Sequence, residues 1–244
     1  MAQGLKDAVL VRTGYGCNNA CVFCNQGDWR TTRGDRAAED VQADVIDGAR
    51  RAALGAGVVV LAGGEVTLRH ELPHWIETAR RHGARRVVIQ TNGRMLAYPK
   101  LAETLVTSGA DTFAVALHGP RAQVHDWLTQ APGSFDQAVR GVRNVVRAGA
   151  RVYINTVITR SGFRHLPELA ALLPSLGARG IRFIWPDAAG KALDLKPSVL
   201  PSPYMVAPHL WRAVEIAQAR GRRVIFEGPP DFPAPEERHA VHGT

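Results

Sequence analysis

Short runs of apolar residues alternate along this chain with longer stretches in which apolar residues recur at helical spacing. The short runs end at Gly or polar residues and predict buried strands at residues 8–13, 58–61, 86–91, 112–117, 151–158 and 181–185. The longer stretches predict amphipathic helices at residues 39–54, 71–82, 99–108, 135–148, 166–176 and 204–220. Each predicted strand is thus followed by a helical return, an order typical of α/β proteins.

The predicted strands are apolar on almost every residue, which indicates that both faces of the sheet are covered. Short right-handed crossovers between successive strands would make that sheet parallel. Six strand–helix units are fewer than the eight of a closed barrel, so we expect an α/β fold with a partial (β/α)6 TIM-like barrel. A doubly wound open sheet is the alternative.

The length of 244 residues suits one hydrophobic core. We expect residues 1–190 to form the barrel core, and residues 191–244 to form a C-terminal extension of loop, helix and tail that closes the barrel or its substrate side. Four prolines predict a long loop or lid at residues 194–208, and a short apolar run follows at residues 224–226. Ser134 is the expected N-cap of the fourth helix.

Composition and charge narrow the possible functions only slightly. No run of about 18 apolar residues and no secretory signal is evident, so we expect a cytoplasmic protein that does not contact a membrane. The net charge of +8 admits a nucleic acid, an anionic substrate or an acidic redox partner. Because most basic residues are spread along amphipathic helices, a solvated surface is favoured over a nucleic-acid site, which stays possible.

All three cysteines lie within eight residues, as Cys17, Cys21 and Cys24 in the spacing C-x3-C-x2-C. Their odd number and clustering argue against disulfides and favour metal ligation in a reducing compartment. Three thiolates leave one coordination position without a cysteine. This suits a [4Fe–4S] cluster with one open iron, or a catalytic zinc with an open position. A structural zinc site completed by His70, His118 or His125 is a further alternative.

Polar residues or glycines directly follow each predicted strand. In a parallel sheet these carboxyl ends meet on one side, where ligand-binding residues collect. After the six strands come, in order, residues 13–17; Gly63, Gly64 and Glu65; Thr91, Asn92 and Gly93; His118 and Gly119; Asn155 and Thr156; and Trp185, Pro186 and Asp187.

Together these motifs resemble the radical S-adenosylmethionine (SAM) enzyme superfamily. The resemblance rests on the cysteine motif with Phe23 before its last cysteine, on the glycine motif after the second strand, and on the order of the later strand ends. It extends over residues 8–187. The chain departs from the commonest form of the family by having Val66 where proline usually follows Glu65.

The resemblance implies that Cys17, Cys21 and Cys24 hold three irons of a [4Fe–4S] cluster. The fourth iron would bind the amino nitrogen and carboxylate of SAM. An electron from a donor such as flavodoxin or ferredoxin would cleave SAM into methionine and a 5′-deoxyadenosyl radical, which takes a hydrogen atom from the substrate. The cofactors carry this chemistry, and the protein positions them.

The resemblance also implies a set of residues that bind SAM. They are Phe23, Gly63, Gly64, Glu65, Asn92, Asn155, Arg160 and Ile184. The two glycines would let backbone approach the methionine amino group, and Glu65 would accept a hydrogen bond from that group or brace the loop. The backbones near Phe23 and Ile184 would contact adenine and Asn155 the ribose, while Asn92, His118 and Arg160 are candidates for the ribose or the carboxylate. The candidate catalytic residues are His118, Trp185 and Asp187, of which the last two would lie where substrate meets the radical. His125 and Asp126 are candidates for contact with substrate or for proton transfer, or mark only the start of a helix.

Other features bear on the substrate. The absence of cysteines after Cys24 argues against auxiliary iron–sulfur clusters, and we expect no cobalamin-binding or N-terminal peptide-recognition domain. The segment 117–158 resembles a subgroup that includes maturases of ribosomal peptides, so we expect a peptide or a small natural product or metabolite as substrate. The alternatives are a radical SAM enzyme that acts on RNA or a nucleotide, and a non-catalytic module that binds metal or nucleic acid.

Overall fold

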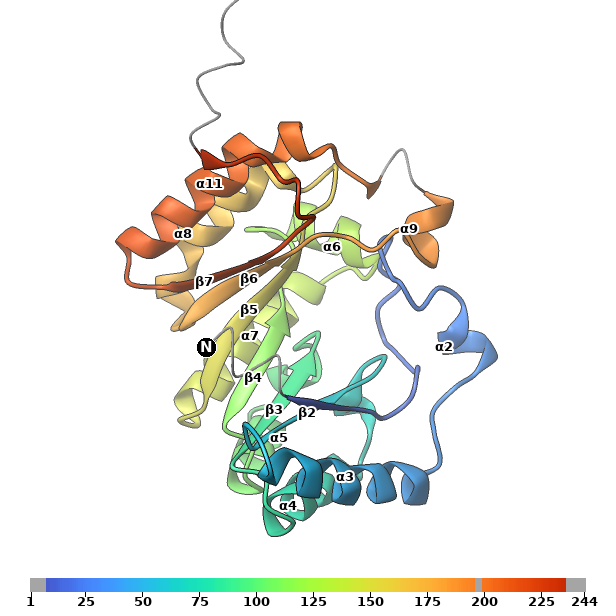
Figure 1. The fold of residues 1–244 in the computed structure, drawn as a ribbon. Helices are drawn as coiled ribbons and strands as arrows, with labels where there is room; N and C mark the ends of the chain where they lie inside the picture. The colour runs from blue at the N-terminus through green and yellow to red at the C-terminus, as the bar shows by residue number, and fades with distance from the viewer. Residues whose placement is uncertain (1–7, 196–198, 236–244) are drawn as a thin grey trace, which may run out of the picture.

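A single parallel sheet organises the computed structural model, which describes residues 8–195 and 199–235. Within these residues the sheet has seven strands, hydrogen-bonded in the order of the sequence (Figure 1). The strands are β1 (Val9–Arg12), β2 (Val58–Ala62), β3 (Arg86–Thr91), β4 (Thr112–Ala116), β5 (Arg151–Val157), β6 (Gly180–Ile184) and β7 (Arg223–Glu227). No pairing between β1 and β7 occurs in this part of the chain, so the curved sheet is an open, partial barrel.

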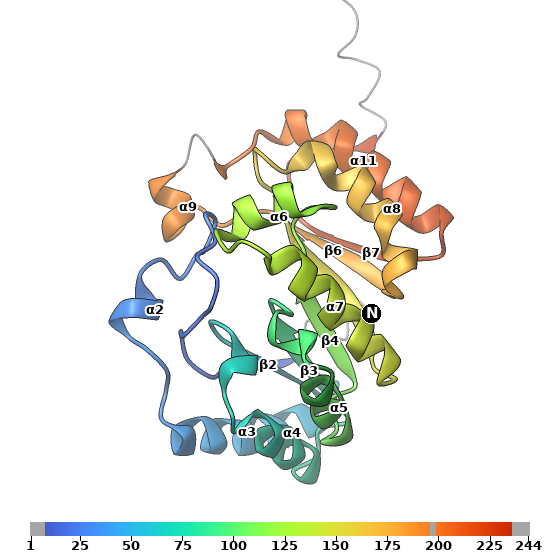
Figure 2. The same ribbon diagram turned by 180° about the vertical axis from the view of Figure 1, so that it is seen from behind.

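Helices cover the outer face of this sheet, as the views from both sides show (Figures 1 and 2). The α-helices are α2 (Trp29–Thr32), α3 (Ala38–Ala53), α4 (Leu72–Arg81), α5 (Pro99–Thr107), α6 (Ala122–Thr129), α7 (Ser134–Arg147), α8 (Leu166–Leu176), α9 (Lys191–Asp194) and α11 (Pro203–Ala219). The short 3-10 helices of the described residues are η1 (Val66–Leu68), η2 (Met95–Ala97) and η3 (Phe163–His165). The predicted α/β partial barrel is confirmed.

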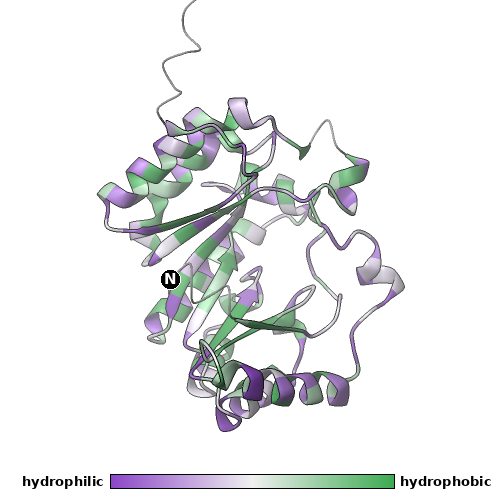
Figure 3. Ribbon diagram, in the orientation of Figure 1, coloured by the Kyte–Doolittle hydropathy of each residue, from purple (hydrophilic) through white to green (hydrophobic). Residues whose placement is uncertain are grey.

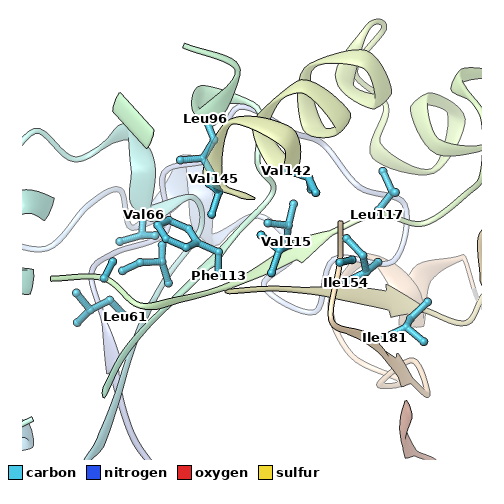
Figure 4. Packing of buried hydrophobic residues seen from close by; sticks show 14 of the residues in the cluster. Leu61, Val66, Leu96, Phe113, Val115, Leu117, Val142, Val145, Ile154 and Ile181 are labelled. Carbon is cyan, nitrogen blue, oxygen red and sulfur yellow. The ribbon is translucent and has the colours of Figure 1, made fainter. Parts of the chain in front are cut away.

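The core lies between the sheet and its outer helices. Phe113 and Val115 of β4 and Ile154 of β5 pack there against Val142 and Val145 of α7 (Figure 4). Complete burial of each such side chain contributes about 1.5–3 kcal/mol of transfer free energy. Ribbon colouring by hydropathy shows apolar strands and a mixture of polar and apolar residues on the helices (Figure 3). The core therefore holds the strands in register and fixes where their carboxyl ends lie.

The sheet has one strand more than the sequence predicted. The apolar run at residues 224–226 forms β7, which pairs in parallel with β6 through Gly180↔Arg223 to Ile184↔Glu227. This run is short, and β7 is an edge strand whose residues are all partly or largely exposed. Its strand character therefore depends on pairing with β6 and on α11 returning the chain to the sheet edge.

The predicted N-cap of α7 was wrong. Ser134 is the first residue of α7, and the N-cap is Gly133 in the left-handed region (φ 80°). The carboxylate of Asp126 caps this helix, because it accepts hydrogen bonds from the backbone N–H groups of Gly133 (2.7 Å) and Phe135 (2.8 Å). Asp126 lies in α6, a helix that is not among the six predicted from the sequence.

The proline-rich stretch at residues 194–208 is not one long loop. Pro203 begins α11, where proline is well accommodated because the first turn has no use for its missing N–H, and Pro208 lies farther inside the helix. Residues 196–198 of this predicted loop lie outside the described residues. Within the described chain, no helix has the length and apolar character needed to cross a membrane.

Candidate functional site

A cavity of about 290 Å³ lies at the carboxyl ends of the strands. It is lined by residues that are far apart in the sequence but follow successive strands. Among them are Cys17, Cys21, Phe23, Cys24, Gly63, Gly64, Asn92, His118, Asn155, Ile184, Trp185 and Asp187. The three predicted metal ligands, most of the predicted SAM-binding residues and all three candidate catalytic residues thus share one cavity.

The cysteine loop is fixed to its surroundings at both ends. At its start, the backbone N–H of Gly16 donates to the Asp35 carboxylate (3.0 Å), while Gly14 (φ 142°) forms an antiparallel bridge with Asp35. Farther along, the backbone N–H groups of Ala20 and Val22 donate to carbonyl oxygens of α6, at 2.9 and 3.0 Å. These bonds hold the loop over the cavity without using any thiol.

Two arginines support the middle of the same loop. Arg94, after β3, donates from its guanidinium to the backbone oxygen of Asn18 and to Oδ1 of Asn19 (3.0 Å). Arg30 donates to the backbone oxygen of Asn19 (2.5 Å). The Arg94 Nε also donates to Gln137 (2.6 Å), which fixes the guanidinium against α7. Neither arginine was among the predicted site residues, because neither lies at a motif position.

The three thiols are partly buried and close enough to influence one another. Burial raises the pKa of Cys17, and burial together with the charges of Cys17 and Cys24 raises the pKa of Cys21 to about 12. Cys17 Sγ is also within reach of the backbone N–H of Asn19 (3.4 Å). Metal or cluster binding at these thiols would therefore release protons, as thiolate ligation requires.

The described residues show no set of side chains that converges on a single zinc ion. Within the described residues, no three His, Cys, Asp or Glu side chains are placed to hold one metal ion together. In a [4Fe–4S] cluster each cysteine binds a different iron, so the sulfurs do not converge on one point. His70 is 93% exposed and does not line the cavity, and His125 Nδ1 already accepts a hydrogen bond. Neither residue supports the structural zinc alternative.

Gly63 and Gly64 line the cavity and also pack tightly against the cysteine loop. A Cβ at residue 64 would lie 2.2 Å from the Gly16 oxygen, and one at residue 63 would lie 2.7 Å from Thr13 Oγ1. The close approach is held by a hydrogen bond from the backbone N–H of Glu65 to the Gly16 oxygen (2.7 Å). The glycines are therefore required for contact between the two loops, in addition to any approach of backbone to a ligand.

Glu65 braces the loop and does not line the cavity. Its side chain is 3% exposed, and its carboxylate accepts hydrogen bonds from Thr67 N (3.0 Å), Thr91 Oγ1 (2.6 Å) and Asn92 N (2.6 Å). The structure thus favours the bracing role among the two predicted for Glu65. Val66, the departure from the family pattern, begins η1 and is completely buried.

Asn92 and Asn155 are placed differently in the cavity. The Asn92 amide donates to Asn18 Oδ1 (2.7 Å) and approaches Cys17 Sγ (3.9 Å), so it helps to position the cysteine loop. Asn155 lies on β5, is 6% exposed, and faces the cavity beside Val157. Contact of either side chain with SAM stays a prediction, as does contact of the backbones near Phe23 and Ile184 with adenine.

His118 and His125 form a stacked, buried pair beside the cavity, with ring centroids 5.6 Å apart. His118 Nδ1 accepts a hydrogen bond from Val157 N (3.3 Å), and His125 Nδ1 accepts one from His118 N (3.0 Å). Each ring therefore carries its proton on Nε2 when neutral. Burial lowers the pKa of both, for His125 to about 4, and His118, which also touches the ring of Phe23, lines the cavity in its neutral form.

Trp185 and Asp187 lie at the rim of the cavity after β6. Trp185 contacts the ring of Phe232 (5.6 Å between centroids), and its backbone N–H donates to the Glu227 oxygen (2.7 Å). Asp187 is exposed and accepts a hydrogen bond from Asn25 Nδ2 (3.1 Å). Trp185 thus combines rim packing with exposure to the cavity, and Asp187 connects β6 to the cysteine loop.

Arg160 is the predicted SAM-binding residue that the structure places apart. It is exposed and does not line the cavity. Its backbone N–H donates to Val199 O (2.9 Å), toward the C-terminal segment. Several residues that the sequence reasoning missed do line the cavity: Asn19, Asn25, Gln26, Arg30, Gln90 and Lys191. Most of them lie within or just after the cysteine motif, and position in the sequence was the only signal that could have found them.

Comparison with known proteins agrees with this geometry. Residues 11–173 match the family model described as the Radical SAM superfamily. The AdoMet-dependent heme synthase of Methanosarcina barkeri is 28% identical over 183 residues, which are 73% of this chain and 51% of that protein. The mycofactocin maturase MftC of Mycobacterium tuberculosis is 33% identical over 165 residues, 67% of this chain and 41% of that protein. The chain thus spans about half the length of the curated relatives it matches.

Solved structures share the fold at low sequence identity. SuiB of Streptococcus suis, bound to its precursor peptide SuiA, superposes with a TM-score of 0.73 and 16% identity, over 92% of this chain and 49% of that one. anSMEcpe with bound AdoMet and a peptide gives a TM-score of 0.68 and 18% identity, over 90% of this chain and 63% of that one.

Proposed function

This chain belongs to the radical SAM superfamily, and from that premise we propose that it cleaves SAM reductively at a [4Fe–4S] cluster and abstracts a hydrogen atom from an organic substrate. The observation that carries the proposal is the meeting of Cys17, Cys21 and Cys24 with Gly63 and Gly64 in one cavity. When bound, the cluster and SAM supply one-electron cleavage of a carbon–sulfur bond. The protein supplies their placement and the exclusion of water.

The residues around the cavity divide this task. Cys17, Cys21 and Cys24 hold the cluster, while Arg94 and Glu65 keep the loops that carry the cysteines and glycines in place. Asn155 and Asn92 hydrogen-bond SAM, and the backbones near Phe23 and Ile184 contact its adenine. Arg160 has no part in this proposal, because it lies apart from the cavity.

His118 presents a neutral imidazole to the cavity. With Nδ1 occupied by the Val157 N–H, its Nε2–H donates a hydrogen bond to the bound ligand and does not remove a proton from it. Trp185 bounds the substrate on one side, and Asp187 holds the rim through Asn25. These assignments make His118 and Trp185 the residues that touch substrate or SAM beyond the cofactor motifs.

The substrate in this proposal is a peptide or a small natural product or metabolite. Support comes from a relative named as a maturase, the mycofactocin maturase MftC, and from the fold shared with SuiB bound to its precursor peptide. Heme-synthesis relatives support a small molecule equally. Residues 1–190 form the catalytic core, and residues 191–244 close its substrate side.

The proposal includes an electron donor and a location. One-electron reduction of the cluster needs a low-potential protein such as flavodoxin or ferredoxin, which are acidic partners suited to a chain with a net charge of +8. The three clustered thiols fit a reducing compartment, so the proposed location is the cytoplasm.

Anaerobic reconstitution with iron and sulfide tests the proposal. The wild-type chain should bind about four irons, and with dithionite and SAM it should release 5′-deoxyadenosine. The Cys24→Ala variant should lose both properties, whereas Ser175→Ala, an exposed control on α8, should keep them. A wild-type protein that carries the cluster and binds SAM, yet releases no 5′-deoxyadenosine, would contradict the proposed reaction.

A further inference from the structure

The interior of the barrel contains a second cavity below the one that holds the cysteines. Its volume is about 630 Å³. The two cavities adjoin each other, because Gln90, Ala114 and Asn155 line both. Its other lining residues come from the amino-terminal halves of the strands and from the segment before β7. They include Leu10, Val58, Val60, Arg86, Val88, Tyr153, Arg182, Gln218, Arg222, Arg223 and Ile225.

The open arc of the sheet leaves this space unfilled. A closed barrel fills its interior with layers of branched side chains contributed by strands on all sides. Here Val60, Val88 and Ala114 line the inner face of a sheet that does not close. Leu10 of β1 is 48% exposed although it lines the cavity, so the cavity presents an apolar wall to solvent. Such a surface favours a ligand with an apolar body.

Among the described residues that line this cavity, the charged ones are all positive. They are Arg86, Arg182, Arg222 and Arg223, and no Asp or Glu of the described chain is in the lining. Among the described residues, Arg86, Arg222 and Arg223 form no ion pair. Clustered charges of one sign within a low-dielectric cleft focus the electrostatic potential and raise the local concentration of oppositely charged ligands.

Arg182 lines the second cavity and lies beside Asn155, which lines both cavities. It pairs in register with Asn155 on β5 and Ile225 on β7, and Ile184, two residues farther along β6, lines the cavity of the cysteines. The two positions are about 7 Å apart along the strand. One guanidinium nitrogen donates to the Glu227 carboxylate (2.5 Å), so the side chain is held in the interior.

Among the described residues, the buried Nε atoms of Arg182 and Arg222 have no hydrogen-bond partner. A buried N–H without an acceptor costs free energy. Both side chains are partly exposed, so an anion in the cavity would be held by the other N–H groups of these guanidinium groups. Guanidinium groups also bind carboxylates and phosphates in a planar, two-point geometry, which lysine cannot do.

We propose that the lower cavity binds an organic anion, whose carboxylate or phosphate is held by Arg182 and Arg222 and whose apolar body lies against Leu10, Val60 and Ile225. The ligand is the substrate or a part of it, so this inference rests on the proposed function and names its substrate class. An anion at Arg182 places the rest of the molecule beside Asn155 and Ile184, next to the cofactor cavity.

Calorimetric titration of the reconstituted full chain with SAM tests the inference, with three probes that share one tail: octanoate, octyl phosphate and 1-octanol. We expect at least one anion to bind about tenfold more tightly than 1-octanol, because charge-assisted hydrogen bonds are stronger than neutral ones. The tighter of the two anions distinguishes a carboxylate from a phosphate ligand. Arg182→Gln and Arg222→Gln should each weaken binding of that anion about fivefold or more.

Matched variants separate local from general effects. Arg140→Gln removes the same charge from the exposed face of α7 and should leave binding unchanged. Leu10→Asp adds a negative charge to the cavity wall and retains every arginine. It should therefore weaken binding of the anion, and it tests the inference even if an arginine variant fails to fold. Equal binding of 1-octanol and the anions, or unchanged anion binding in Arg182→Gln and Leu10→Asp, would overturn the inference. Because binding is read without turnover, a chain that binds the anion but releases no 5′-deoxyadenosine contradicts only the proposed function.

Discussion

The carboxylate of Glu65, after β2, accepts a hydrogen bond of 2.6 Å from the backbone N–H of Asn92, after β3. This bond joins the loop of the glycine motif to the loop whose asparagine amide reaches the cysteines. A buried side chain 27 residues away in sequence thus sets the spacing of two loops at the rim of the cavity.

Replacement of Glu65 by Gln should destabilise the protein. The Gln amide keeps one acceptor oxygen but sets an N–H₂ group against one of the donors, and loss of a buried hydrogen bond costs about 1–3 kcal/mol. Denaturant titration should show this decrease in the free energy of unfolding. Glu103→Gln, on the exposed face of α5, is the control and should change stability by less than about 0.5 kcal/mol. Equal stability of E65Q and wild type would contradict the bracing role.

Gly64→Ala should disturb the cavity through backbone contact. The added Cβ would lie 2.2 Å from the Gly16 oxygen, so one of the two loops must move, at a cost of about 1–3 kcal/mol. We expect a lower thermal midpoint and a lower iron content after reconstitution. The corresponding change at Gly55, where a Cβ would meet its nearest atom at 4.0 Å, should have neither effect. Full iron content in G64A would show that the loops can separate without loss of the site.

Arg94→Met should loosen the cysteine loop without touching a cysteine. It removes the donors to Asn18, Asn19 and Gln137, and hydrogen bonds of a charged group contribute about 1.5–3 kcal/mol each. The reconstituted variant should lose iron to a chelator faster than wild type, measured from the decay of the visible absorbance. Arg140→Met on α7 is the control. Identical rates of iron loss would argue against support of the loop by Arg94.

Asn155→Ala should weaken SAM binding. Loss of one hydrogen bond of about 1–1.5 kcal/mol corresponds to a rise in Kd of about tenfold. Equilibrium binding to the reconstituted protein measures this change, and Gln123→Ala on the exposed side of α6 serves as control. If N155A binds SAM as tightly as wild type, the predicted contact with the ribose is wrong.

Stability should fall in mild acid because of His125. Burial lowers its pKa from 6.5 to about 4 in the folded protein, although the Asp126 carboxylate opposes that shift. Protons therefore bind the unfolded chain more strongly, and stability is complete above pH 6.5 and decreases as the pH falls toward 4. A shift of this size corresponds to about 3 kcal/mol.

Denaturant titration at several pH values measures this slope. His125→Asn keeps an acceptor near the backbone N–H of His118 and should make the slope shallower. The exposed His74→Asn control should keep the slope of wild type. The same slope in H125N and wild type would assign the acid sensitivity to other groups.

Much of the fold was determined by local sequence patterns. The predicted bounds of α8 and β3 are those observed, and each of the other predicted helices and strands differs by one residue at one or both ends. Periodicity succeeds here because each strand is covered by the helix that follows it, so local pattern and tertiary burial agree. Likewise the cysteine spacing and the glycines after β2 carry their chemistry within a few residues.

The tertiary structure decided what depends on residues distant in the sequence. Glu65 is a brace only because β3 places Thr91 and Asn92 beside it, and Arg94 supports the cysteine loop from 75 residues away. The strand β7 exists through its pairing with β6. Side chains alternate between the two faces of β6, as in any strand. The curvature of the sheet decides which of these faces lies inside the barrel, and this is the face that carries Arg182. The sequence by itself therefore determined the family and the order of the elements, whereas closure of the strands into an arc determined which side chains share a cavity.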